Sequence, residues 1–260
     1  MNKVTDPLFS VNGKVVLITG GTSGIGEMMV RGMVERGAHV YIVSRNAQDC
    51  TLLAEKLSAS GDCRALPGDV STVEGIMQIA AKLEESEKEL DILVNAAGIH
   101  QIAPIDDFDE AMWDTTNNVN LKGPFFLIRR LLPLLRKAAQ HDGPARIINI
   151  ASGHGIKTSR FDSYAYHATK AALIHMTRHL SSKLAQDNIT VNAIAPGIFP
   201  SRITAGFDAK LVAEIKRSVP LGRYGSAEDA VGTLVYLCSR AGAYVSGVAL
   251  PVDGGWLAAP

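Results

Sequence analysis

A tyrosine and a lysine four residues apart, Tyr166 and Lys170, are the side chains of this sequence best suited to proton transfer. On a helix this spacing places both on one face, one turn apart, whereas Tyr164 falls off that face. A free tyrosine has a pKa of about 10 and exchanges protons poorly near neutral pH. A neighbouring ammonium favours the phenolate and lowers that pKa. The pair therefore predicts the acid–base step that a carbonyl needs when a hydride adds to its carbon.

A glycine-rich turn near the start of the chain is the second feature with chemical consequences. It follows an apolar run at residues 14–19 and leads into a helical pattern from Glu27. Glycines let the backbone approach a ligand closely, and the free N–H groups at a helix start attract a phosphate. Strand, turn and helix in this order predict a dinucleotide site. The cofactor-binding candidates here are Gly20, Thr22, Ser23, Gly24, Ile25 and Gly26.

The residues that follow the second expected strand, at residues 39–43, indicate which dinucleotide binds. An acidic residue there would bond the ribose hydroxyls of NAD and repel the 2′-phosphate of NADP. This sequence has Ser44, Arg45 and Asn46 instead, with no carboxylate. A guanidinium is a planar, permanently charged partner for a phosphate, and the two neighbours add hydrogen bonds. We therefore expect NADP as the cofactor.

Apolar runs rich in β-branched residues alternate with segments of helical spacing along the whole chain. Strands are expected at residues 14–19, 39–43, 91–95, 146–150 and 190–194, with weaker candidates at 63–66 and 248–252. Helices are expected at residues 27–36, 47–58, 73–89, 121–139 and 227–238. This alternation predicts an α/β fold, a single Rossmann-type doubly wound parallel sheet of about seven strands with helices on both faces. Ligands bind such sheets beyond the carboxyl ends of the strands.

Composition argues against several other classes of protein. The 26 Lys and Arg balance the 26 Asp and Glu, which leaves no basic footprint for nucleic acid or an anionic membrane. No signal-peptide pattern and no uninterrupted apolar run of about 18 residues is present, so we expect a cytoplasmic protein. Cys50, Cys63 and Cys238 form no CxxC pair, and His175 and His179 lack the glutamate of HExxH, so no metal site is expected. With no linker or repeat, we expect one domain over residues 1–260.

The spacing Gly20-x-x-x-Gly24-x-Gly26 resembles the TGxxxGxG turn of the short-chain dehydrogenase/reductase family, and further marks of that family follow in order. Asp69 and Val70 resemble its adenine-contacting element. Asn95, Ala96 and Gly98 resemble its NNAG motif, with Ala96 in place of the second asparagine, and the resemblance implies that Asn95 lies near the adenosine ribose. The segment that holds the nicotinamide carboxamide is matched by Pro196, Gly197, Phe199 and Ser201.

The same resemblance assigns catalytic roles to four residues. Ser152 would hold the substrate carbonyl, Tyr166 would donate the proton, and Lys170 would tune Tyr166 and bond the nicotinamide ribose. Asn120 matches the asparagine that helps to organise a proton-relay water. Taken alone, Ser152 and Asn120 also fit ordinary turn and helix-end positions. The stretch from Ser152 to Tyr166 is one residue longer than in many relatives, which indicates a small loop insertion between residues 153 and 163.

The resemblance implies an NADP(H)-dependent reductase of carbonyls to secondary alcohols. Within the family the chain most resembles 3-oxoacyl-[acyl-carrier-protein] reductases, particularly the type associated with rhamnolipid synthesis, and hence fatty acid metabolism. A sugar, steroid or other secondary-alcohol dehydrogenase is the alternative enzyme, and a non-catalytic NADP-sensing regulator is the alternative of another class. Residues 199–220 are a candidate substrate lid, with apolar contacts from Phe199, Ile203, Phe207 and Val212.

Two kinds of protein partner are also expected. A basic face of the helix at residues 121–139 would suit an acidic acyl carrier protein. Its basic side chains are Arg129, Arg130, Arg136 and Lys137. The same helix resembles one that family members use to form a dimer, so a homodimer or homotetramer is expected as well.

Overall fold

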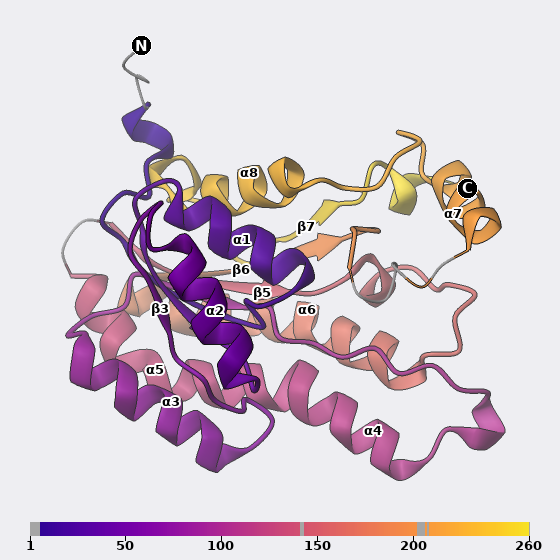
Figure 1. Cartoon of the computed structure of the whole chain (residues 1–260), viewed down its shortest axis with the longest axis horizontal. Helices are drawn as coiled ribbons and strands as arrows, with labels where there is room; N and C mark the ends of the chain where they lie inside the picture. Colours follow the sequence, from indigo (N-terminus) through magenta and orange to yellow (C-terminus); the bar gives the residue numbers. More distant parts are fainter. Residues whose placement is uncertain (1–5, 141–142, 202–205, 207, 260) are drawn as a thin grey trace.

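The structure is a computed structural model that describes residues 6–140, 143–201, 206 and 208–259 (Figure 1). Its centre is one sheet of seven parallel strands in the order β3-β2-β1-β4-β5-β6-β7. The strands are β1 (Val15–Thr19), β2 (His39–Val43), β3 (Cys63–Ala65), β4 (Ile92–Asn95), β5 (Ala145–Ile150), β6 (Ile189–Pro196) and β7 (Ala249–Val252). All seven expected strands form, and the predicted doubly wound parallel sheet is confirmed.

Helices cover both faces of the sheet because its central strands are apolar on both sides. In β1, Val16 and Ile18 pack into one core while Val15 and Leu17 pack into the other, as the period of two along a strand requires. The first core is closed by α1 (Gly24–Val34), α2 (Ala47–Leu57) and α8 (Ala227–Cys238). The second is closed by α3 (Val73–Ser86), α5 (Gly123–Ala138) and α6 (Tyr164–Leu184).

Several helix boundaries differ from the sequence prediction, and two of the differences have a clear local cause. Helix α3 ends at Ser86 rather than at residue 89, because the backbone of Glu87 is extended and its carboxylate accepts a hydrogen bond from the Tyr41 hydroxyl (2.7 Å). Helix α5 begins at Gly123, and the residues before it form a π-helical segment, Asn118–Lys122, that continues α4 (Glu110–Asn117). Single π-helical turns of this kind often mark functional sites.

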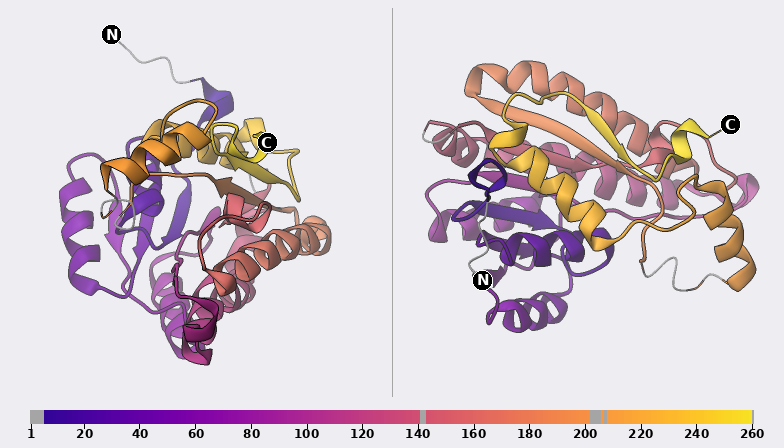
Figure 2. Two further views of the ribbon diagram at one scale, coloured as in Figure 1. Left: turned by 90° about the vertical axis from the view of Figure 1, so that its right-hand side faces the viewer. Right: turned by 90° about the horizontal axis from the view of Figure 1, so that it is seen from above.

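The strand order reverses between β1 and β4, so the loops that follow these two strands separate and leave room for a ligand. The arrow of β6 points toward the side of the molecule on which the C-terminus and α7 (Ala209–Ser218) lie (Figure 1). Seen from above, α7 and the C-terminal turn lie at one end of the molecule, away from the N-terminus (Figure 2). Within the described residues, no helix has both the length and the hydropathy to cross a bilayer.

Candidate active site

A cavity of about 890 Å³ opens at the carboxyl ends of the strands. Its lining comes from the turn after β1, the loops after β4 and β5, helix α6, the segment after β6 and the C-terminal turn. It brings together many of the sequence-predicted residues: Gly20, Ser23, Gly24, Ile25, Gly26, Ala96, Gly98, Ser152, Tyr166, Lys170, Pro196, Gly197, Phe199 and Ser201. The two features singled out first in the sequence, the Tyr–Lys pair and the glycine turn, therefore face one space.

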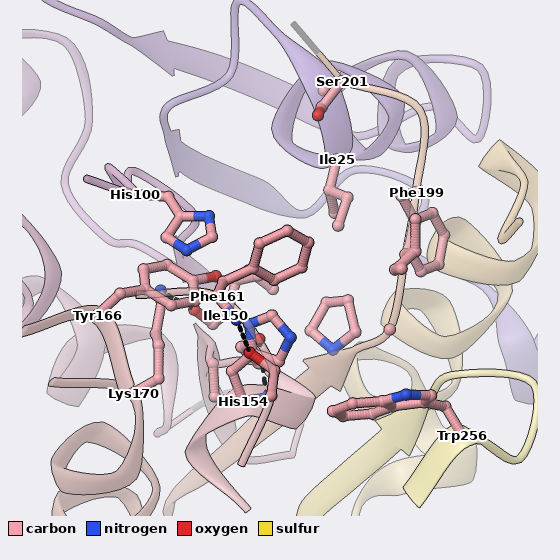
Figure 3. Close-up of a pocket in the computed structure, with 18 of the residues that line it drawn as sticks. Ile25, His100, Ile150, His154, Phe161, Tyr166, Lys170, Phe199, Ser201 and Trp256 are labelled. Atoms are coloured by element: carbon pink, nitrogen blue, oxygen red, sulfur yellow. Dashed lines mark hydrogen bonds between the residues drawn. The ribbon is translucent and has the colours of Figure 1, made fainter. Parts of the chain in front are cut away.

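Helix α6 presents Tyr166 and Lys170 to this cavity one turn apart (Figure 3). The Lys170 ammonium donates a hydrogen bond to the carbonyl oxygen of Ile150 (2.7 Å) and lies 5.6 Å from the centre of the Tyr166 ring. Ser152 stands at the start of a short 3-10 turn after β5, where its Oγ accepts a hydrogen bond from the His154 N–H (3.1 Å). Ser152 also hydrogen-bonds Tyr166. A hydroxyl, a phenol and an ammonium thus converge at one point of the cavity.

Burial controls the protonation of this group. It raises the pKa of Tyr166, and the hydrogen bond from Ser152 offsets only part of that rise. Burial also lowers the pKa of Lys170 to about 8. The net shift of the Tyr166 pKa is upward, opposite to the lowering expected from Lys170, because burial outweighs the other effects on the phenol. Tyr166 stays protonated at neutral pH, which is the state a proton donor needs.

Asn120 is fully buried in the π-helical segment, and it does not line the cavity. Its Oδ1 accepts a hydrogen bond from the N–H of Ile99 (2.9 Å), and its Nδ2 donates to the carbonyl of the same residue (3.0 Å) and to Thr169 Oγ1 (3.4 Å). The side chain therefore fastens the loop after β4 to α6. In this geometry Asn120 positions the cavity wall.

The turn after β1 fits the phosphates of a dinucleotide. Gly20 has a φ of +67°, and a Cβ there would come within 2.7 Å of the Ala97 backbone. Helix α1 begins at Gly24, and Ser23 before it makes no capping hydrogen bond with its side chain. The first residues of α1 line the cavity, so the unpaired N–H groups and positive dipole end of an eleven-residue helix are directed at a ligand there.

Arg45 lies beside this turn but outside the cavity, just beyond the end of β2. Its side chain is exposed and makes no hydrogen bond or ion pair within the described part of the chain. Ser44 accepts a hydrogen bond from Thr22 Oγ1 (3.1 Å), which ties the end of β2 to the glycine turn. Asn46 caps α2 by accepting from the N–H of Asp49 (3.2 Å). Of these three predicted phosphate contacts, only the arginine has its full bonding capacity available.

Three other predicted cofactor residues are engaged within the protein. The Asp69 carboxylate accepts a hydrogen bond from the N–H of Ser71 (2.8 Å), and Val70 is buried in the core. Asn95 is 2% exposed, and its Nδ2 donates to Asn149 Oδ1 (2.9 Å), which links β4 to β5. The geometry favours a structural role for the Asn95 side-chain nitrogen, because it bonds the side-chain oxygen of Asn149 on the neighbouring strand. The buried Oδ1 of Asn95 makes no hydrogen bond within the described residues.

The other end of the cavity is walled by aromatic rings that sequence reasoning did not assign to the site (Figure 3). His100 lies 4.2 Å from the Tyr166 ring, measured between centroids, and His154 stacks on His167 at 4.9 Å. Trp256 meets His154 edge to face at 5.4 Å, and Phe161 lies 6.1 Å from the same ring. His100 and His154 each stand two residues after a predicted site residue, Gly98 and Ser152, and that position was the available signal. Trp256 follows no predicted site residue so closely, and nothing in the sequence indicated its place in the cavity.

The two cavity histidines are neutral at physiological pH. Burial, reinforced by nearby positive groups, lowers the pKa of His100 to about 4 and that of His154 to about 4. Each imidazole therefore offers one donor and one acceptor and no charge. Within the part of the chain that the structure describes, no three His, Cys, Asp or Glu side chains form a group that could hold a metal ion.

The candidate lid at residues 199–220 contributes both ends of its length to the cavity. Phe199 is buried and lines it, as does Ile215 on α7. Arg160, in the loop after β5, forms an ion pair with Glu214 on α7 (2.9 Å). Two predicted lid contacts, Ile203 and Phe207, lie outside the described residues.

The chain is similar to known proteins over almost its whole length. The family model described as "Enoyl-(Acyl carrier protein) reductase" matches residues 20–257. The chain is 41% identical over 252 residues to the rhamnolipids biosynthesis 3-oxoacyl-[acyl-carrier-protein] reductase of Pseudomonas aeruginosa, covering 96% of this chain and 98% of the relative. It is 37% identical over 254 residues to 2-dehydro-3-deoxy-D-gluconate 5-dehydrogenase of Dickeya dadantii, with the same coverage, 96% and 98%.

A solved structure is similar over almost the whole chain. The Pseudomonas aeruginosa RhlG/NADP active-site complex superposes with a TM-score of 0.94 at 41% identity, covering 97% of this chain and 100% of that one. The match to the family model and the full-length identities confirm the family indicated by the sequence motifs. This chain belongs to the short-chain dehydrogenase/reductase family.

Proposed function

We propose that the protein is an NADP(H)-dependent oxidoreductase that reduces the 3-oxo group of an acyl thioester to a secondary alcohol. The observation that carries this proposal is the convergence of Ser152, Tyr166 and Lys170 on the cavity that the glycine turn also lines. The 41% identity to a 3-oxoacyl-[acyl-carrier-protein] reductase supports the substrate class. The RhlG/NADP complex and the unpaired, exposed Arg45 support the cofactor.

The residues of this chain divide the reaction between them. The reduced nicotinamide, when bound, supplies the hydride that adds to the substrate carbonyl carbon. Ser152 donates a hydrogen bond to the carbonyl oxygen, and Tyr166 transfers its phenolic proton to that oxygen as negative charge develops. Lys170, charged below its pKa of about 8, stabilises the phenolate that remains. Oxidised cofactor and a 3-hydroxyacyl thioester are the products.

The substrate end of the cavity suits an acyl chain better than a polyol. Phe161, Phe199, Ile215 and Trp256 line it, and they offer dispersion contacts and apolar surface. A sugar acid, the alternative suggested by the Dickeya relative, has several hydroxyl groups that each need a partner when buried. Polar side chains such as Lys157, Arg160 and Glu214 line the cavity as well, so it is the four large apolar side chains that favour the thioester.

The ion pairs on α5 reduce the positive charge that this helix could offer to an acyl carrier protein. Arg130 binds Glu84 through both of its terminal nitrogens (2.6 and 2.7 Å), and Arg136 binds Asp187 (2.9 Å). Two of the four basic side chains proposed for docking are thus neutralised within the chain. A coenzyme A thioester is therefore the first substrate to test, with the carrier-bound thioester beside it.

Association of this chain with itself rests on apolar groups at the surface of α4 and α5. Trp113 and Phe125 are 45% and 39% exposed on these helices. Burying such side chains against a second copy would remove apolar surface from water. We propose a homodimer or homotetramer, to be tested by light scattering coupled to size-exclusion chromatography, where a monomer mass at micromolar concentration would contradict it.

A substrate panel tests the proposed reaction. NADPH oxidation is followed with acetoacetyl-CoA, with the corresponding carrier-bound thioester, and with a set of simple ketones; NADP⁺ reduction is followed with gluconate-type sugar acids and polyols. We expect the highest kcat/KM with a 3-oxoacyl thioester. Rapid turnover of a sugar acid without turnover of any thioester would replace this proposal by the sugar-dehydrogenase alternative. Full biological effect of a Tyr166→Phe variant that still binds NADPH would revive the sensing role.

A further inference from the structure

His100 is a polar side chain of the cavity that makes no hydrogen bond to the rest of the fold or to the catalytic group within the described residues. Neither of its ring nitrogens makes a hydrogen bond within the described residues; Nε2 is buried, so Nδ1 is the nitrogen that a ligand in the cavity can reach. A buried polar atom without a partner costs about 1–3 kcal/mol, so native proteins keep few of them, and those often serve a function. The ring lines the cavity next to Tyr166, at 4.2 Å between centroids.

The neighbours of His100 on both sides are held by hydrogen bonds, Ile99 through its backbone and Gln101 through its side-chain Oε1. Ile99 before it is bonded at both its N–H and its carbonyl by the fully buried Asn120 (2.9 and 3.0 Å). Gln101 after it accepts a hydrogen bond from the hydroxyl of Thr116 (2.9 Å), which is also buried. The imidazole is thus presented from a clamped loop, the arrangement expected of a group that must meet a ligand in one position.

We propose that His100 is a specificity-determining residue that hydrogen-bonds the thioester carbonyl of the substrate while Tyr166 and Ser152 bond the 3-oxo group. This inference rests on the proposed function and assigns the second carbonyl of the substrate to a residue. The two carbonyl carbons of a 3-oxoacyl thioester are separated by one CH₂ group, so their oxygens need two neighbouring partners. His100, in ring contact with Tyr166, is placed to be the second.

The chemistry of the imidazole fits an uncharged oxygen. The pKa of about 4 keeps His100 neutral near pH 7, where it can donate one hydrogen bond to a carbonyl without attracting a carboxylate. His154 is the other imidazole in the cavity, but its ring lies farther from Tyr166, at 6.1 Å, and stacks on His167. We therefore assign the carbonyl contact to His100 and a wall position to His154.

A matched pair of substrates isolates this contact. One is the 3-oxobutanoyl thioester of N-acetylcysteamine; the other is the thioether in which CH₂ replaces the thioester carbonyl, so that only the 3-oxo group remains. We expect His100→Phe to lower kcat/KM for the thioester about tenfold, the loss of one hydrogen bond of ordinary strength, and to leave the thioether within about twofold. His100→Gln keeps a donor and should restore most of the preference. His179→Phe, an exposed site on α6, is the control.

The outcomes distinguish failure of the His100 assignment from failure of the proposed reductase function. Equal loss on both substrates, no loss on either, or a selective loss with His154→Phe in place of His100→Phe would overturn the assignment while leaving the reductase intact. Failure of the wild-type enzyme to reduce either compound would overturn the proposed function and this inference together. NADPH affinity, followed by fluorescence titration, should be the same in all variants, because a collapsed cavity would lower it.

Discussion

The two ends of the cavity are built in different ways. At the cofactor end, the turn at Gly20 and the first residues of α1 present backbone N–H groups, and their arrangement depends on a few glycines close together in the chain. At the substrate end, rings from residues more than 150 positions apart, such as His100 and Trp256, face the same space. The first end is set by local backbone geometry, which a short motif specifies. The second is set by side chains that only the complete fold brings together.

Tyr166 lies where the two ends meet, and its removal should have the largest effect. Tyr166→Phe deletes the proton donor while keeping the ring, and we expect kcat to fall about 10²- to 10⁴-fold with little change in NADPH affinity. Tyr164→Phe is the control, because that hydroxyl bonds Asp162 (3.3 Å) and lies outside the cavity lining. Stopped-flow measurement of NADPH oxidation checks both. Near-normal turnover by Tyr166→Phe would show that another group protonates the product.

The cofactor end can be tested through Arg45. Arg45→Ala removes the exposed guanidinium expected to meet the 2′-phosphate, and hydrogen bonds to charged groups contribute about 1.5–3 kcal/mol. KM for NADPH should therefore rise about tenfold to a hundredfold while KM for NADH stays constant. Arg240→Ala, an exposed arginine on another part of the surface, serves as the control. An equal change for both cofactors would remove Arg45 from phosphate recognition.

The buried lysine predicts the pH dependence of reduction. Lys170 is protonated below its folded-state pKa of about 8 and loses its charge as pH rises through that value. Because the ammonium stabilises the Tyr166 phenolate, kcat for carbonyl reduction should be flat near neutrality and fall by up to about tenfold per pH unit above about 8. A rate profile in which the activity stays constant to pH 10 would be incompatible with this role for Lys170.

The smallest effect is expected at the substrate end, where α7 is tied to the loop after β5. Glu214→Gln breaks the ion pair with Arg160, whose side chain is 57% exposed. Exposed pairs contribute about 0.2–1 kcal/mol, so KM for the carbonyl substrate should rise by no more than about fivefold, with kcat and NADPH affinity unchanged. High salt should reduce the difference between variant and wild type. A large loss of kcat would mean that this contact supports the catalytic group itself.

The same division explains how far the sequence could predict the molecule. The seven strands were predictable because buried parallel strands are continuous apolar runs, and the Tyr166–Lys170 relation because helix geometry fixes it. The short-chain dehydrogenase/reductase family was recognisable from motifs in fixed order, and the comparisons confirm it. Each strand, the Tyr–Lys pair and each single motif is defined by residues that lie close together in the chain.

Other properties depend on contacts that no local pattern specifies. The raised pKa of Tyr166 results from burial, and the engagement of Asn95 with Asn149 results from the pairing of β4 with β5. His100 and His154 resembled ordinary histidines in the sequence, and only the packing around Tyr166 shows that they face the cavity. The glycine turn and helix start at the cofactor end were therefore predictable from a local pattern, and the rings at the substrate end were not.

In the proposed reaction, a hydride passes from NADPH to the 3-oxo carbon of an acyl thioester within this cavity. The most direct measurement uses NADPH deuterated at the transferable position of nicotinamide C4, with acetoacetyl-CoA as acceptor and mass spectrometry of the product. We expect 3-hydroxybutyryl-CoA that carries one deuterium at C3, formed in equal amount to the NADPH consumed. Tight NADPH binding without deuterated product from this or any longer 3-oxoacyl thioester would contradict it.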